Sequence, residues 1–141
     1  MGNNVNMKKF DKSKIEKIAE KYGLRLLILF GSQAGEKKHL HAESDFDVAY
    51  LGKKDLDLEE EAKLISDMMP VFQSEKVDLA NLKKADPLLL KQIFEDHELL
   101  YSHNPNDYYR YKVYSERKFK EASPLFELRE YLLNRFLEKH A

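Results

Sequence analysis

Residues 28–47 read ILFGSQAGEKKHLHAESDFD, and this stretch carries the features from which we predict both fold and chemistry. An apolar segment ends at Gly31 and Ser32, and the next apolar segment begins with Asp45 and Asp47 at alternating positions. Successive side chains of a strand point to opposite faces, so residues two apart project the same way. The pattern predicts a turn that can approach a phosphate, opposite two carboxylates held side by side.

The two carboxylates predict a metal site. Like charges this close disfavour joint ionisation, and no cation lies on either immediate flank of the pair. Magnesium suits such a site because it takes hard oxygen ligands and completes its shell with water and substrate phosphates. Asp78 is a third carboxylate, between Val77 and Leu79, and on a mixed sheet it could face the pair. Three converging aspartates can hold two metal ions.

Each of these signals also has a simpler interpretation. A Gly-Ser turn between a strand and a helix is usually only a turn, and the spacing of a Walker loop is absent. Asp45 and Asp47 could be solvated charges on an edge strand. Asp78 could be hydrogen-bonded to the neighbouring backbone.

Length and composition exclude several classes of protein. The 141 residues match one domain with one core, and 24 Lys+Arg against 25 Asp+Glu give a net charge of -1, without the basic field of a generic nucleic-acid binder. The chain has no cysteine, which excludes disulfides and thiolate chemistry and agrees with a reducing, cytoplasmic location. Neither a signal peptide nor an apolar run of about 20 residues is present, so we expect no membrane segment.

Periodicity predicts an α+β domain. Asp11 caps the first helix, and we expect the helix after residue 57 to end at Pro70 with Leu58, Ala62, Ile65 and Met69 as its inner stripe. The expected order is helix 11–22, strand 24–30, strand 46–51, helix to 69, strand 76–80, helix 87–96, strand 98–101, helix 108–122 and, after a cap at Ser123 and Pro124, a last helix to 139.

The motifs FGSQA at 30–34, SDFDV at 44–48 and VDL at 77–79 together resemble the nucleotidyltransferase superfamily of DNA polymerase beta. In size the chain is similar to the minimal nucleotidyltransferase (MNT) proteins, the antitoxins of HEPN ribonuclease toxins. The resemblance covers about residues 11–101. It implies a nucleotidyltransferase fold with a small mixed β-sheet, helices packed on one side, and a C-terminal helical extension over about residues 106–140, all within one domain spanning residues 1–141.

The resemblance also implies roles for single residues. Gly31 and Ser32 would hold the nucleotide phosphates, Asp45 and Asp47 would ligate Mg2+, and Asp78 would complete the site and help to deprotonate the acceptor. The implied reaction transfers AMP from ATP to a hydroxyl, with pyrophosphate leaving. In the antitoxin branch the acceptor is a tyrosine of the HEPN toxin. We expect the toxin and a nucleoside triphosphate as partners, no membrane and no direct nucleic-acid binding, and we leave a homo-oligomer open.

The sequence departs from the family pattern after the Gly-Ser turn. The family commonly has an arginine there and ten residues between that serine and the first aspartate, whereas this chain has Gln33 and twelve residues. Lys37 or Lys38 would replace the missing charge, or both are solvated. His39 and His41 are expected to be exposed loop residues rather than metal ligands, because no further ligand spacing supports them. Two alternative functions stay open: an antitoxin that acts by binding alone, and a small-molecule nucleotidyltransferase, for which 141 residues leave little room.

The C-terminal third is rich in aromatic and basic residues. It either forms a protein interface or seals the last helices against the domain. A basic stretch could touch RNA or an acidic partner, or be a solvated face. The last helix carries an apolar stripe that must pack on the body or on a partner. The residues concerned are Tyr101, Tyr108, Tyr109, Arg110, Tyr111, Lys112 and Tyr114, then Arg117, Lys118 and Lys120, then Leu125, Leu128, Leu132 and Phe136.

Overall fold

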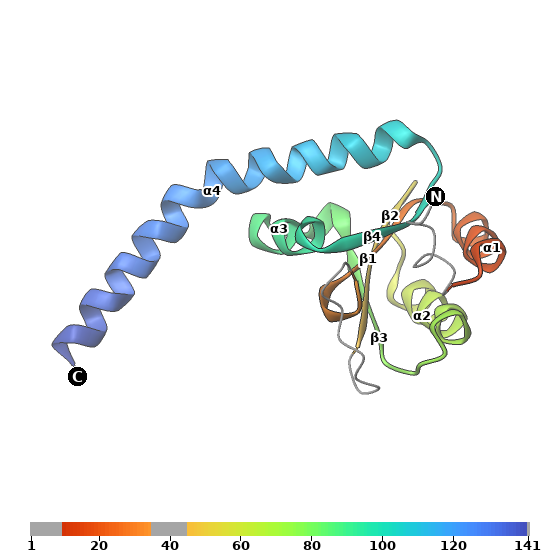
Figure 1. The fold of residues 1–141 in the computed structure, drawn as a ribbon, viewed down its shortest axis with the longest axis horizontal. Helices are drawn as coiled ribbons and strands as arrows, with labels where there is room; N and C mark the ends of the chain where they lie inside the picture. The colour runs from red at the N-terminus through yellow and green to blue at the C-terminus, as the bar shows by residue number, and fades with distance from the viewer. Residues whose placement is uncertain (1–9, 35–44, 141) are drawn as a thin grey trace, which may run out of the picture.

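A four-stranded mixed β-sheet lies at the centre of the computed structural model, which describes residues 10–34 and 45–140 (Figure 1). The strand order is β3-β2-β1-β4, with β1 antiparallel to β2 and β4, and β2 parallel to β3. The sheet and the order of elements up to residue 102 confirm the predicted α+β fold. The elements are α1 (Lys12–Tyr22), β1 (Leu24–Phe30), β2 (Phe46–Gly52), α2 (Leu58–Phe72), β3 (Val77–Asn81), α3 (Pro87–Glu95), β4 (His97–Ser102) and α4 (Pro105–Lys139).

Local sequence sets the start of the fold as predicted. The side chain of Asp11 accepts hydrogen bonds from the backbone N–H groups of Ser13 and Lys14, at 3.0 and 3.3 Å, and so caps α1. Gly23 ends the helix with φ +63°, a left-handed conformation that favours glycine. Strand β1 follows at once.

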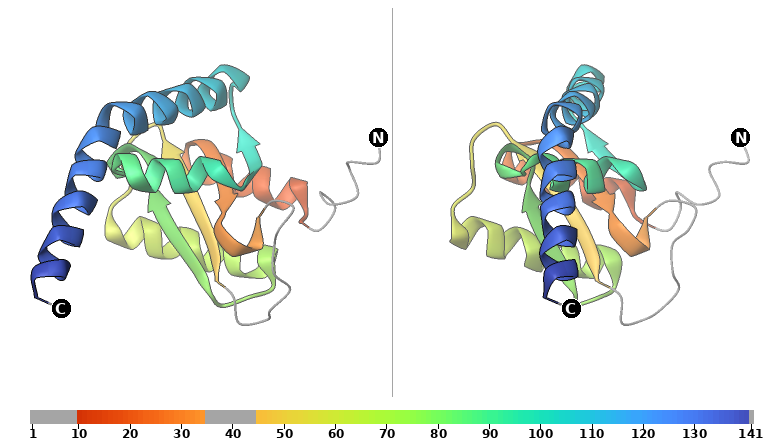
Figure 2. Two further views of the ribbon diagram at one scale, coloured as in Figure 1. Left: turned by 60° about the vertical axis from the view of Figure 1, so that its left-hand side comes forward. Right: turned by 90° about the vertical axis from the view of Figure 1, so that its left-hand side faces the viewer.

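Helices cover both faces of the sheet, whereas we expected them on one side (Figure 2). Leu27 and Leu29 of β1 pack with α1 and α2, and Leu26 and Ile28 pack on the other face with α3. Partly buried Tyr108 and Tyr111, from the start of α4, complete this second core. Its other buried residues come from β2, the 3-10 turn after β3, and α3: Ala49, Leu51, Leu82, Leu90 and Ile93. The reason is that β1 is apolar at consecutive positions, so both of its faces must be buried.

Pro70 does not end α2, contrary to our prediction. The helix continues to Phe72, and Gln73 caps it with φ +54°. Proline lacks the N–H that would bond to the carbonyl of Ser66, but both residues are exposed, so water can satisfy that group. The predicted inner stripe is right only in part: Ile65 and Met69 pack against the core, whereas Ala62 is exposed and Leu58 is 84% exposed. The buried residues of the helix are Leu64, Met68, Val71 and Phe72.

Helix α4 is one continuous helix of 35 residues, where we predicted two. Pro124 lies inside it, and the helix bends near its middle (Figure 1). An interior proline bends a helix without ending it when the freed carbonyl, here that of exposed Lys120, can reach water. The first half contacts α3, β1 and β4. In the second half, more than half of the surface is exposed at Leu125, Leu128, Leu132, Leu133, Phe136 and Leu137. That residues 1–141 form one domain stays a prediction.

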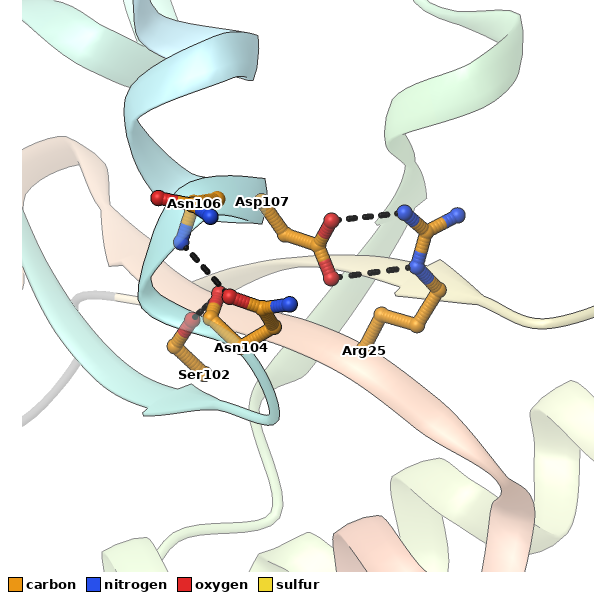
Figure 3. A network of polar contacts seen from close by, with 5 residues as sticks. All are labelled: Arg25, Ser102, Asn104, Asn106 and Asp107. Carbon is orange, nitrogen blue, oxygen red and sulfur yellow. Dashed lines mark hydrogen bonds and ion pairs between the residues drawn. The ribbon is translucent and has the colours of Figure 1, made fainter.

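An ion pair fastens the start of α4 to the sheet (Figure 3). The Arg25 guanidinium donates to both carboxylate oxygens of Asp107, at 2.6 and 3.2 Å. The side chain of Asn104 accepts from the N–H of Asn106 and caps the helix next to this pair. The guanidinium holds the pKa of the Asp107 carboxyl below its usual value. Among the described residues, no helix combines the length and the apolarity needed to cross a membrane.

Candidate functional site

The predicted site residues meet where β1 ends and where β2 and β3 begin. Asp47 lies opposite Phe30 in the antiparallel pairing with β1 and opposite Asp78 in the parallel pairing with β3. The backbone N–H of Phe46 donates to the carbonyl of Lys76, at 2.8 Å, and fixes the start of that parallel pair. The register therefore brings two of the three predicted carboxylates side by side.

The same two carboxylates also share a face of the sheet. Val48 and Leu79, the residues that follow Asp47 and Asp78, pack into the core formed with α1 and α2. Side chains alternate along a strand, so Asp47 and Asp78 project toward the opposite face, on which α3 packs. Asp45 is exposed and lies one residue before the start of β2, two positions before Asp47.

Gly31 lies close against Asp47, so a side chain at this position would have to displace the Asp47 carboxylate. Its φ is +81°, and a Cβ at this position would collide with Oδ2 of Asp47. Ser32 lies in the short 3-10 turn Gly31–Gln33 that follows β1, and the turn is closed by a hydrogen bond from the N–H of Ala34 to the carbonyl of Gly31. The Gly-Ser turn thus lies directly against the Asp47 carboxylate.

Asp47 has an unusual electrostatic environment. Partial burial, followed by the negative charges of Asp78 and Asp45, raises the pKa of its carboxyl to about 6. Each of these causes disfavours the ionised form. A ligand with positive charge would relieve all three at once.

Two properties of the donor set bear on whether it can hold a magnesium ion: its arrangement and its chemistry. Among residues 10–34 and 45–140, no group of three or more His, Asp or Glu side chains is arranged to hold a metal ion. The chemistry of the donors nevertheless fits, because Asp45, Asp47 and Asp78 supply only hard carboxylate oxygens. Magnesium is also commonly held by one or two carboxylates, with substrate phosphates completing its shell. A pair such as Asp47 and Asp78 meets that requirement.

A cleft of about 430 Å³ opens beside the Gly-Ser turn. One side is formed by Gly31, Ser32 and Asp47, and the other by Gln92, Glu95 and Asp96 at the end of α3. Sequence reasoning missed these three residues of the α3 side. They precede β4 by a few positions, and only the pairing of β4 with β1 brings them to the turn.

His97 fastens that side of the cleft. It lies opposite Phe30 in the pairing of β1 and β4, and its Nδ1–H donates to the carbonyl of Phe94, at 3.1 Å. Its Nε2 therefore accepts from the hydroxyl of Tyr108, at 2.7 Å. Burial lowers the pKa of His97, so the ring is neutral and links α3, β4 and α4. Lys37, Lys38, His39 and His41 lie outside the described residues.

The chain is similar to known proteins in sequence and in fold. Residues 13–106 match the family model described as "Polymerase beta, Nucleotidyltransferase". No curated protein sequence matches the chain. Solved structures are also similar in fold over most of the chain, among them the following three.

The first is a toxin-antitoxin MntA-HpeT mutant in which two aspartates, two positions apart, are replaced by glutamate; identity is 22%, coverage 90% of this chain and 98% of that chain, and the TM-score 0.71. The second is a toxin-antitoxin with AMP-PNP, at 24% identity, the same coverages and a TM-score of 0.70. The third is the tri-AMPylated Shewanella oneidensis HEPN toxin in complex with MNT antitoxin, at 23% identity, coverages of 89% and 95%, and a TM-score of 0.65. At these identities the likeness establishes the fold alone.

Proposed function

The chain belongs to the polymerase beta nucleotidyltransferase family, and from this premise we propose that it is a magnesium-dependent enzyme that transfers AMP from ATP to a hydroxyl of a partner protein. The partner in this proposal is a HEPN toxin, the acceptor is one of its tyrosines, and the chain is the antitoxin. Two similar structures support this: one contains an AMPylated HEPN toxin with its MNT antitoxin, and another contains AMP-PNP.

The observation that carries the proposal is the contact of one carboxylate with both parts of the site. Asp47 pairs with Asp78 across β2 and β3 and touches Gly31 at the end of β1. A nucleotide whose phosphates lie along the Gly-Ser turn would therefore present them to the carboxylates. The raised pKa of Asp47 supports a cation there, since the carboxylates repel one another without one.

Each residue has a role in the proposed reaction. Gly31 lets the triphosphate approach the backbone, and Ser32 offers its hydroxyl to a phosphate oxygen. Asp45, Asp47 and Asp78 hold magnesium, which when bound neutralises phosphate charge and lowers the pKa of the attacking hydroxyl. Exposed Asp78 takes the proton of that hydroxyl. The acceptor oxygen bonds to the α-phosphorus, the bond to the bridging oxygen breaks, and pyrophosphate leaves.

The test uses ATP labelled at either the α- or the γ-phosphate, with the purified product of the adjacent gene as the proposed HEPN partner. With magnesium, the α-label is expected to move to the partner and the γ-label to leave as pyrophosphate. EDTA is expected to stop the transfer, and tyrosine-to-phenylalanine variants of the partner identify the acceptor. Transfer of the γ-label to the partner instead would mean phosphorylation and would refute the proposal.

A second candidate is an antitoxin that neutralises its partner by binding alone. The observation that favours it is that no group of three ligands among the described residues is already arranged for a metal. The two functions differ in what the variant Asp45→Asn/Asp47→Asn does to ribonuclease activity of the partner. Full neutralisation by this variant supports binding alone, whereas its loss supports transfer.

A further inference from the structure

A second cavity lies at the other end of the sheet from the cleft. It has a volume of about 630 Å³ and is formed by the start of β1 and the first half of α4. This volume lies within the range of about 300–1,000 Å³ typical of small-molecule sites. The inference drawn from it does not depend on the proposed transfer reaction.

The cavity carries excess positive charge. Three arginines line it, Arg25, Arg110 and Arg117, against the single carboxylate of Asp107. Asp107 is buried and bound by Arg25 at both oxygens (Figure 3). Within residues 10–34 and 45–140, neither Arg110 nor Arg117 forms a hydrogen bond or a close ion pair, although Arg110 is near enough to lower the pKa of Asp107. Two guanidinium groups are thus available to an anion.

Aromatic rings line the same cavity. They belong to Tyr109, Tyr111 and Tyr114, and the rings of Tyr111 and Tyr114 meet edge to face with centroids 5.5 Å apart. Tyr109 is 62% exposed, so its ring is open to a ligand. Planar rings and guanidinium groups both stack on nucleobases, and guanidinium groups also bind phosphate through paired hydrogen bonds. The lining combines the two chemistries that a nucleotide requires.

Distance separates this cavity from the Gly-Ser turn. Arg25 is the second residue of β1 and Gly31 directly follows the last, so six residue steps of extended chain separate them, or about 20 Å. One nucleotide cannot occupy both places. The cavity is therefore a site of its own.

We propose that the cavity between β1 and α4 is a second, non-catalytic binding site for a nucleoside phosphate. The phosphate groups bind Arg110 and Arg117, and the base stacks on the exposed tyrosine rings. The ion pair of partly exposed Arg25 with buried Asp107 holds the helix in place beneath the ligand.

The test is equilibrium dialysis of the whole protein with ADP in buffer containing EDTA, so that the contribution of magnesium to binding in the cleft is removed. The variant Arg110→Ala/Arg117→Ala changes two exposed residues, so the core is kept. The matched control is Arg129→Ala/Arg135→Ala, which removes the same charge from the outer half of the same helix. Unfolding curves for each variant check that it is folded.

We expect the wild type to bind ADP and the Arg110→Ala/Arg117→Ala variant to bind it about tenfold or more weakly. The control is expected to bind within about twofold of the wild type. ADP should bind about tenfold more tightly than inorganic phosphate, and Tyr109→Leu/Tyr114→Leu should remove most of that difference.

Three results would overturn the proposal. The first is that the wild type does not bind ADP in EDTA, or that the Arg110→Ala/Arg117→Ala variant binds it as well as the wild type. The second is that inorganic phosphate binds as tightly as ADP, which would mean an anion site without a base. The third is that a hexaglutamate peptide displaces bound, labelled ADP at a lower concentration than unlabelled ADP does. This result would make the cavity a docking site for an acidic protein segment.

Discussion

Asp47 lies directly opposite Asp78 in the parallel pairing of β2 and β3, and it also touches Gly31 at the end of β1. One side chain thus joins the turn that can hold phosphate to the carboxylates that can hold a cation. The arrangement is unfavourable in the free protein, since burial and two negative neighbours oppose ionisation of Asp47. Strain of this kind is common at functional sites, and each of its causes can be tested separately.

Replacing Gly31 by alanine should impair both stability and activity. Its φ of +81° disfavours a side chain by about 1–2 kcal/mol, and the new Cβ would displace the Asp47 carboxylate. We expect the transfer rate to fall about tenfold or more. Gly23→Ala is the matched control, since φ is +63° and no atom lies within 4 Å of the added Cβ. Urea denaturation should show similar losses of stability in Gly31→Ala and Gly23→Ala. Equal transfer rates in these two variants would contradict the proposed contact of Gly31 with Asp47.

The pKa of Asp47 predicts the pH dependence of the metal-free protein. The folded chain holds this proton up to about pH 6, whereas the unfolded chain releases it near 3.8. The folded state therefore binds more protons in this interval, and the free energy of unfolding should decrease as the pH rises through it. Asp47→Asn should remove that decrease and raise stability above pH 6, as measured by urea denaturation. Asp55→Asn, at an exposed aspartate, should keep the slope. An unchanged slope in Asp47→Asn would be evidence against this origin.

Magnesium should stabilise the wild type at neutral pH, where Asp47 is ionised. A ligand that binds only the folded state raises the free energy of unfolding, by about 2.7 kcal/mol at a hundred times its dissociation constant. In Asp47→Asn the increase should be much smaller, and in Asp55→Asn it should equal that of the wild type. Thermal unfolding with and without magnesium measures both. If magnesium raised the free energy of unfolding of Asp47→Asn as much as that of the wild type, the cation would have to bind at another place.

The ion pair of Arg25 and Asp107 should contribute to stability more than the surface pairs do. Asp107→Ala leaves a partly buried guanidinium without its partner, and we expect a loss of about 2 kcal/mol in urea denaturation. Lys63→Ala breaks the exposed pair with Glu59 and should cost less than about 0.5 kcal/mol. Equal losses in the two variants would show that Asp107 does not fasten α4 to the sheet.

Pro124→Ala should straighten α4 without affecting transfer. Alanine restores the hydrogen bond to the carbonyl of Lys120 and is favoured over proline in a helix interior by about 3 kcal/mol. Hydrogen exchange near residues 120–124 should slow, while the rest of the domain is unchanged. If exchange there stays as fast as in the wild type, the bend has another cause.

The candidate site could be predicted in large part because its signals are local. A glycine after an apolar strand and two alternating aspartates are properties of neighbouring residues, and strand geometry alone places Asp45 and Asp47 on one side. The placement of Asp78 needed only the assumption of a mixed sheet, which the register of β2 and β3 satisfies. The roles of these residues stay predictions.

Other features depend on tertiary contacts that no local pattern encodes. Pro70 and Pro124 lie within helices because their freed carbonyls face water, and exposure is a property of the folded chain. The helix α2 continues past Pro70 and so adds Val71 and Phe72 to its buried face, which a helix ending at Pro70 could not include. Gln92, Glu95 and Asp96 line the cleft only because β4 returns beside β1.

The most direct test of the central claim is the intact mass of the HEPN partner after incubation with ATP, magnesium and each form of this chain. We expect the wild type and Asp55→Asn to add whole AMP units to the partner, and Asp45→Asn/Asp47→Asn and Asp78→Asn to add none within the same time. An unchanged mass gain with these aspartate variants would contradict the assignment of Asp45, Asp47 and Asp78 as the centre of transfer.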